Sequence, residues 1–331
     1  MPEPLVSVKM ITYNHAPFIA QAIDGVLMQK TNFPFELVIG EDCSTDGTRE
    51  IVFEYQKKYP DIIRIITSDN NVGGKKNSYR TRKACRGKYI AFCEGDDYWH
   101  HPQKLQKQAD YMEGHPECGL AFADFNVYLV KDKKCIPSVN YHEGFQMPMN
   151  LTIEQIICGR LIRATCTAVI RKELYNKIIE GDPYLHQGDN FLMGDTQIWA
   201  EMSVISKVTY IPETLATYNK LDESASRSNN PIKGWRFMKS SQDLRLYLID
   251  KYNLAEDIRN SIEAAWCNAT LRLAFHSRNL TLADEVKMRK KIFTWKERLR
   301  YYGAKHAVWY YVYHSAAFIP NLFRKKREVW L

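Results

Sequence analysis

Three carboxylate side chains, Glu94, Asp96 and Asp97, follow directly on the apolar run of residues 88–93. Like charges this close repel one another, so they are stable either in water or around a cation. Carboxylate oxygens are ligands that Mg²⁺ and Mn²⁺ accept, with phosphate and water completing the shell. The acidic cluster therefore indicates a solvated turn or a divalent-metal site, and an isolated Asp-Asp pair favours the turn.

Polar side chains also follow two earlier apolar runs. They are Thr12, Tyr13 and Asn14 in the first case and Asp42 in the second. Asp46 and Thr48, a little further on, are typical of a turn followed by a helix N-cap.

A fourth acidic candidate, Asp195, is the first residue of the predicted helix 195–205. It could cap that helix, or act as a general base, and the two roles are compatible. Asp189 is the rival candidate for the base. In the basic loop 71–82, Lys76 and Arg80 could contact phosphate at a helix N-terminus, or lie on a solvated helix face.

Alternating strands and helices place these residues. We expect strands at 5–11, 35–39, 62–67 and 88–93, and helices at 17–29, 48–59 and 77–86. This order predicts a parallel sheet covered on both faces, with ligands at the carboxyl ends of the strands. Further on we expect a helix at 104–112, strands at 118–130, 163–170 and 207–211, and only helices from about residue 231.

Three motifs together carry a family resemblance. VSVKMITYNH, ELVIGEDCSTDGT and GKYIAFCEGDDYW occur in this order, and over roughly residues 5–225 the chain resembles the inverting family 2 glycosyltransferases. The resemblance implies an α/β, GT-A type fold: a mostly parallel, Rossmann-like sheet flanked by helices, here with a C-terminal helical extension. It also implies a nucleotide-sugar-binding half (1–103) and an acceptor-binding half (104–228). The helical pattern that follows predicts a helical extension (229–331) beyond the region of resemblance.

The resemblance assigns roles to the candidate residues. Asp97 would bind Mn²⁺ or Mg²⁺, and Asp96 would share the metal and lie near the ribose. Asp42 would accept the uracil N3–H of a UDP-sugar, and Thr12 and Tyr13 would line the base. Asn14, Lys76 and Arg80 complete the predicted nucleotide site, and Asp195 would be the catalytic base. The family often has Asp where this chain has Glu94, and residues 218–226 resemble its loop that closes over the site.

The C-terminal segment differs from the rest of the chain. Residues 287–327 contain twelve Lys or Arg and one acidic residue, interleaved with Trp and Tyr. This composition is typical of a bilayer interface, and the apolar part, about residues 307–319, is too short to span a membrane. We expect peripheral attachment to an anionic membrane at its cytoplasmic face, with a glycan or lipid-linked glycan as acceptor. A helical cap packed on the body is the alternative, and nucleic acid is not expected because no matching module accompanies the charge.

Other features exclude several classes. The eight cysteines form no CxxC pair, which argues against zinc and favours free thiols in a reducing cytosol. We expect no signal peptide, because the first residues lack a charged and an apolar region. A Gly-rich phosphate loop does not follow the first strand, which argues against a nucleotidyltransferase or a Rossmann dehydrogenase. A membrane-bound nucleotide-sugar-binding protein without turnover remains the alternative to an enzyme.

Overall fold

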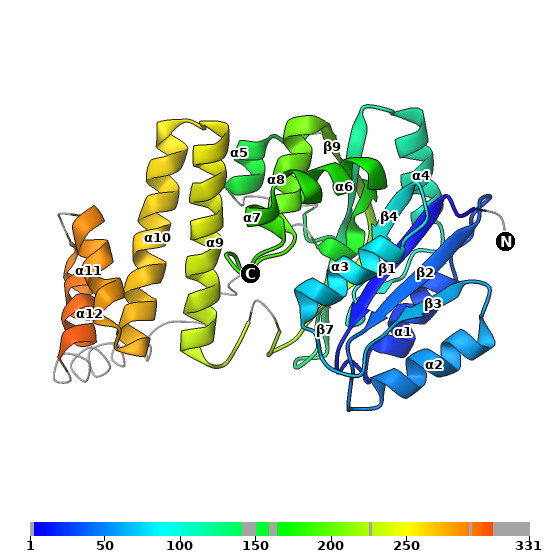
Figure 1. Ribbon diagram of the computed structural model, residues 1–331, viewed down its shortest axis with the longest axis horizontal. Helices are drawn as coiled ribbons and strands as arrows, with labels where there is room; N and C mark the ends of the chain where they lie inside the picture. Colours follow the sequence, from blue (N-terminus) through cyan, green and yellow to red (C-terminus); the bar gives the residue numbers. More distant parts are fainter. Residues whose placement is uncertain (1–2, 141–149, 159–163, 225–226, 291–292, 307–331) are drawn as a thin grey trace. The chain divides into compact units, whose positions relative to one another are not determined.

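The computed structural model describes residues 3–140, 150–158, 164–224, 227–290 and 293–306. The chain forms two compact units (Figure 1). The first contains residues 1–190 and 194–221, and the second contains 191–193 and 222–331. The predicted division at residues 103 and 228 stays a prediction.

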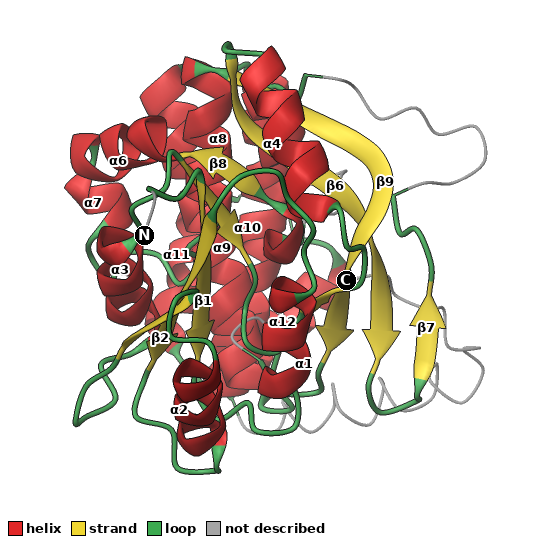
Figure 2. Cartoon of the chain, turned by 90° about the vertical axis from the view of Figure 1, so that its right-hand side faces the viewer, coloured by secondary structure: helices red, strands yellow, loops and turns green. Residues whose placement is uncertain are grey.

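The first unit is built on one mixed sheet. Its strands are β1 (Val6–Thr12), β2 (Phe35–Glu41), β3 (Ile63–Ile66), β4 (Tyr89–Phe92), β5 (Tyr98–Trp99), β6 (Cys118–Leu129), β7 (Lys134–Ile136), β8 (Val169–Arg171) and β9 (Lys207–Lys220). They lie in the order β3-β2-β1-β4-β8-β6-β9-β5, and β7 pairs with β6. Figure 2 shows β1, β2, β6, β8 and β9 of this sheet, with β7 at one side. The strands β3, β2, β1 and β4 are parallel, as predicted, and β8 is antiparallel to both β4 and β6.

Helices cover this sheet. They are α1 (Ile19–Leu27), α2 (Thr48–Lys58), α3 (Gly74–Ala84), α4 (Lys104–Gly114), α5 (Ile153–Ile157), α6 (Lys172–Gly181), α7 (Pro183–His186) and α8 (Thr196–Ile205), with one 3-10 turn, η1 (Thr165–Thr167). Alternate residues of β1 face opposite ways: Val8 is in the core that includes α1 and α2, whereas the Lys9 ammonium donates to Ser78 of α3. The fold is therefore the GT-A type α/β fold expected from the sequence.

Three predicted segments differ from the structure. Residues 163–170 were expected as a strand, but the described part forms the η1 turn and only the short strand β8. The predicted strand 207–211 continues to Lys220 as β9, because it pairs with β6 along its length across several bulges. The expected loop 218–226 therefore begins inside the sheet.

The second unit is helical in its described part, as predicted. It contains α9 (Pro231–Tyr252), α10 (Glu256–Ser277), α11 (Leu280–Arg289) and α12 (Trp295–Lys305). Along α10, Ile262, Trp266 and Leu273 are buried at the helical spacing that the sequence indicates. No helix among the described residues combines the length and apolar character needed to cross a bilayer. The predicted interfacial segment 307–319 lies outside the described residues.

Candidate active site

The ends of β1 and β2 are tied together by their backbones and side chains. The Asp42 N–H donates to the Thr12 carbonyl at 3.1 Å. Asn14, in a left-handed conformation (φ 56°), accepts from the Thr45 N–H and donates its own N–H to the Ser44 hydroxyl. Asn adopts this conformation more readily than most residues. The predicted nucleotide residues Thr12, Asn14 and Asp42 are thus brought to one corner of the sheet.

Asp42 is buried and held in one orientation. Its two carboxylate oxygens accept from the backbone N–H groups of Val72 and Gly73, at 2.9 and 3.0 Å. The Arg80 guanidinium lies 3.5 Å from the same carboxylate and also donates to the Glu41 carbonyl. Arg80, which the sequence indicates as a phosphate contact, therefore helps to hold Asp42 in place.

Two other predicted nucleotide residues are accessible. The Tyr13 side chain is 44% exposed at the end of β1, so a planar base could stack on it. Lys76 is exposed on the first turn of α3. Their predicted contacts with the nucleotide stay predictions.

The acidic cluster lies beside this corner. Gly95 brings the two together, because a Cβ at this position would lie 2.6 Å from the Thr12 hydroxyl. The His15 ring spans the gap, with Nδ1 3.3 Å from that hydroxyl and Nε2 4.0 Å from the Asp96 carboxylate. His15 was not singled out in the sequence, although it directly follows the Thr-Tyr-Asn motif.

Asp96 and Asp97 occupy different environments. The Asp96 side chain is 21% exposed, whereas Asp97 is buried. The Asp97 carboxylate accepts from the Asn219 N–H at 2.9 Å, and the Asn219 amide donates to the Asp96 carbonyl at 2.6 Å. Asn219 belongs to β9, so a strand more than a hundred residues further along the chain holds the acidic pair in place. Sequence reasoning missed Asn219 because its stretch was interpreted as a loop.

Two carboxylates of this cluster, Asp97 and Glu94, have a raised pKa. Burial, and then the neighbouring Asp96 and Glu94 charges, hold the pKa of Asp97 well above its usual range. Burial also raises the pKa of Glu94 to about 7, opposed by Lys9 and reinforced by Asp96 and Asp195. The Glu94 Oε2 atom is buried with no hydrogen-bond partner. A cation would relieve this repulsion, so the residues fit a divalent metal.

The protein supplies only part of a metal shell. Among the described residues, no group of three or more His, Cys, Asp or Glu side chains is arranged to hold a metal ion. Mg²⁺ is commonly held by one or two carboxylates, with substrate phosphates and water completing its shell. Asp96 and Asp97 would be those carboxylates.

Asp195 reaches the same acidic cluster from the other half of the sheet. It is the N-cap of α8, and its Oδ1 accepts from the Thr196 N–H at 2.6 Å and from the Thr196 hydroxyl at 3.2 Å. Its Oδ2 faces the Thr165 hydroxyl at 3.4 Å. The helix cap uses only Oδ1, so Oδ2 could still accept a proton from a substrate hydroxyl. The rival Asp189 has a fully exposed side chain, 3.9 Å from the Lys75 ammonium.

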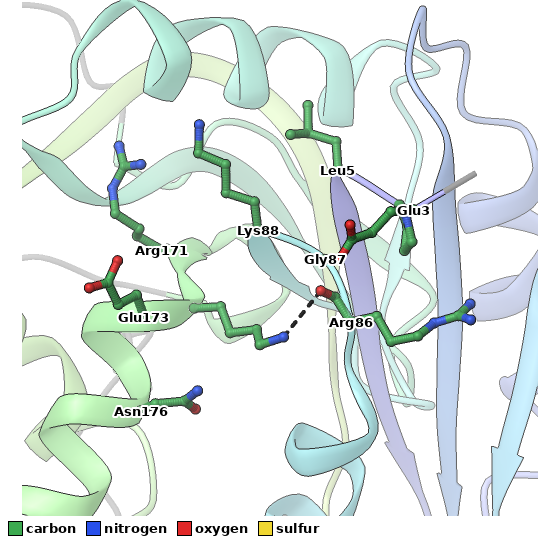
Figure 3. A pocket seen from close by; sticks show the side chains of 10 residues that line it. Glu3, Leu5, Arg86, Gly87, Lys88, Arg171, Glu173 and Asn176 are labelled. Carbon is green, nitrogen blue, oxygen red and sulfur yellow. Dashed lines mark hydrogen bonds between the residues drawn. The ribbon is translucent and has the colours of Figure 1, made fainter. Parts of the chain in front are cut away.

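A pocket of about 600 Å³ lies at the opposite edge, where β1 and β4 begin (Figure 3). Its cations already have partners: Arg86 pairs with Glu36, Lys88 with Glu113, and the Lys172 ammonium donates to the Arg86 carbonyl. Because it is remote from the strand ends that carry the carboxylates, we do not assign the nucleotide to it.

Proteins of known sequence are similar to part of this chain. An uncharacterised protein of Mycobacterium bovis is 31% identical over 218 residues, which are 65% of this chain and 58% of that protein. The dTDP-rhamnosyl transferase RfbG of Shigella flexneri is 38% identical over 107 residues, 31% of this chain and 36% of RfbG. The chain thus spans less than two thirds of the length of these relatives.

Solved structures share the fold. The S. aureus TarS fragment 1–349 in complex with UDP-GlcNAc has a TM-score of 0.55 and 16% identity, covering 97% of this chain and 93% of that one. A Pyrobaculum calidifontis mannosyltransferase in complex with GDP-Man and Mn²⁺ has a TM-score of 0.53 and 14% identity, covering 94% and 86%. The sequence model of glycosyl transferase family 2 matches residues 7–179. On this match, and with the fold described above, the chain belongs to glycosyl transferase family 2.

Proposed function

We propose that this chain is a metal-dependent inverting glycosyltransferase that moves a sugar from a UDP-sugar to a hydroxyl of a glycan. The main support is the gathering of carboxylates from both halves of the fold. Asp96 and Asp97 follow β4, and Asp195 caps the start of α8. The charges of Asp96 and Asp195 are close enough to Glu94 to raise its pKa. A purely structural cluster of this kind would be costly, because each charge disfavours the others.

Each carboxylate has a distinct task in this reaction. The diphosphate leaves as an anion, and a divalent cation held by Asp96 and Asp97 would neutralise its charge. Asp195 removes the proton from the acceptor hydroxyl as that oxygen attacks the anomeric carbon. The accepting atom is Oδ2, since Oδ1 already caps α8. The displacement is a single step, so the anomeric configuration is inverted.

The proposed donor follows from the corner formed by β1 and β2. The Asp42 carboxylate is oriented by two backbone N–H groups, and its remaining lone pairs can accept the N3–H of uracil. Thymine presents the same N3–H, so a dTDP-sugar is the competing donor. The neighbours named above include one solved with UDP-GlcNAc and one named as a dTDP-rhamnosyl transferase.

The test is a donor screen. The purified chain is mixed with Mn²⁺, a panel of UDP-, dTDP- and GDP-sugars and a glycan acceptor, and release of the nucleoside diphosphate is measured. We expect release with a UDP-sugar, its loss on chelation, and its loss in Asp195→Asn. UDP binding should persist in Asp195→Asn. If wild-type protein binds UDP but never releases it from any donor, the chain is a binding protein and the catalytic proposal is wrong.

We also propose that the second unit attaches the chain to the cytoplasmic face of an anionic membrane, where the acceptor would be a lipid-linked glycan. The described surface of α11 and α12 supports this: Met288, Trp295 and Tyr302 are 79%, 64% and 47% exposed and lie among Lys and Arg residues. Exposed aromatics with basic neighbours favour the headgroup region.

Co-sedimentation with vesicles tests the attachment. The full chain should sediment with phosphatidylglycerol vesicles and not with phosphatidylcholine vesicles, and Trp295→Ala combined with Met288→Ala should weaken this. Deleting residues 287–331 should abolish it. Equal sedimentation of all three proteins would contradict the proposal.

A further inference from the structure

The η1 turn lies between the acidic pair and Asp195. The Thr165 hydroxyl donates to the Asp195 Oδ2 at 3.4 Å. The next residue, Cys166, is buried, and its thiol is near enough to the Asp97 carboxylate to affect the pKa of that carboxylate. This short turn therefore lies between the carboxylate that caps α8, which it contacts through Thr165, and the acidic pair that follows β4.

Buried side chains fix this turn on both sides. The Trp99 indole N–H donates to the Cys166 carbonyl at 2.7 Å. The Gln108 amide donates to the Thr167 carbonyl at 2.8 Å and to Ala121 of β6 at 3.1 Å. The Thr167 hydroxyl bonds to the Ala164 carbonyl within the turn. A turn held by this many buried hydrogen bonds can orient a side chain more precisely than a free loop can.

We propose that Thr165 is a positioning residue that orients the Asp195 carboxylate for proton abstraction, an inference that rests on the function proposed above. Without it, only the Thr196 contacts hold the Asp195 carboxylate among the described residues, and both involve Oδ1. The carboxylate could then rotate about its Cβ–Cγ bond and turn Oδ2 away from the acceptor. The Thr165 hydroxyl prevents this rotation.

The expected effect is moderate. At 3.4 Å the contact is longer than a strong O–H···O hydrogen bond, and such bonds often tighten only when substrate binds. We therefore expect Thr165→Val, which has nearly the same volume but no hydroxyl, to lower kcat by about tenfold, equivalent to about 1.4 kcal/mol of transition-state stabilisation. The KM for the donor should stay within about twofold, because Thr165 contacts the proposed catalytic base Asp195 and none of the residues proposed to bind the nucleotide.

The experiment compares three variants of the full chain with wild type, using the donor identified in the screen. Thr165→Val should lower kcat, and Thr165→Ser, which keeps the hydroxyl, should restore at least half of it. Thr294→Val is the matched control, since it removes a threonine hydroxyl that caps α12, and it should leave kcat unchanged. Circular dichroism and Tm confirm that each variant is folded, and UDP affinity by calorimetry should be the same in all four proteins.

The outcomes separate this inference from the function on which it rests. If wild type shows no turnover with any donor, the proposed function is wrong. If wild type turns over and Asp195→Asn does not, but Thr165→Val keeps wild-type kcat, only the positioning role is wrong. If Thr165→Ser is as slow as Thr165→Val, or if KM rises instead of kcat falling, the hydroxyl does not orient the base and the inference is overturned.

Discussion

Lys104, at the start of α4, is fully buried, and its ammonium group is buried with the rest of the side chain. Its Nζ donates to the Gln108 side-chain oxygen at 2.7 Å and lies 4.1 Å from the centre of the Trp99 ring. Burial lowers the pKa of Lys104 from 10.5 to about 7, partly offset by the neighbouring Cys166, Cys93 and Glu94. The folded protein therefore releases this proton at a lower pH than the unfolded chain.

The consequence is a pH-dependent stability. Between about pH 7 and 10.5 the unfolded chain binds a proton that the folded protein does not, so the free energy of unfolding rises with pH by about 1.4 kcal/mol per unit. Below this window both states are protonated, and the full cost of burying the charge is present. Lys104→Met removes the group from both states. The stability of wild type relative to Lys104→Met should therefore increase by about 2.7 kcal/mol between pH 7.5 and 9.5.

Urea unfolding followed by tryptophan fluorescence measures this difference. Other groups titrate alike in both proteins and cancel in the comparison. Lys107→Met is the matched control, because Lys107 is on the same helix but 35% exposed and paired with Glu213. The Lys107→Met difference from wild type should stay constant over this range. A Lys104→Met difference that is equally constant, or that changes in the opposite direction, would refute the reasoning.

Three further predictions concern the site and its support. Asp97→Asn should lower kcat by roughly a hundredfold, the size of effect seen when one preorganised electrostatic group is removed. It should also raise the Tm of the metal-free protein at pH 7, because the raised pKa of Asp97 means that its charge opposes folding there; an unchanged or lower Tm by scanning calorimetry would contradict this. Gln108→Met should destabilise the fold by about 2–4 kcal/mol in urea, since the carbonyls of Ala121 and Thr167 lose their donors, and a change below 1 kcal/mol would show that water replaces them. Asp42→Ala should raise the donor KM by roughly tenfold, the loss of one charged hydrogen bond, and an unchanged KM would remove Asp42 from the nucleotide site.

Local sequence patterns were sufficient for the first half of the fold. The apolar runs and helical spacings predicted β1 to β4 and the helices between them, because each element buries one face or both and its residue types show this directly. Polar residues at strand ends were equally visible. Parallel strands bring their carboxyl ends to one edge, so Thr12, Asp42 and the acidic pair were expected together before any contact was known.

Local patterns failed where long-range pairing outweighed them. Residues 163–170 have the apolar character of a strand, yet Thr165–Thr167 turn, because their polar groups bond to Trp99 and Gln108 from distant parts of the chain. The strand was expected to end at residue 211, and residues 218–226 were expected as a loop, yet the strand continues to Lys220 because β6 supplies the pairing partner. Neither partner can be identified from the segment itself.

The sequence by itself therefore determined which chemical groups are present at each strand end and in what order. Only the tertiary structure decided which oxygen of each carboxylate accepts a hydrogen bond, and from which residue. It assigns the Asp195 Oδ1 to a helix cap and turns Oδ2 towards Thr165, and it buries Asp97 against Asn219 while leaving Asp96 partly exposed. The physical reason is that hydrogen bonds act over about 3 Å, whereas the residues that make them here are 30 and 122 positions apart in the chain.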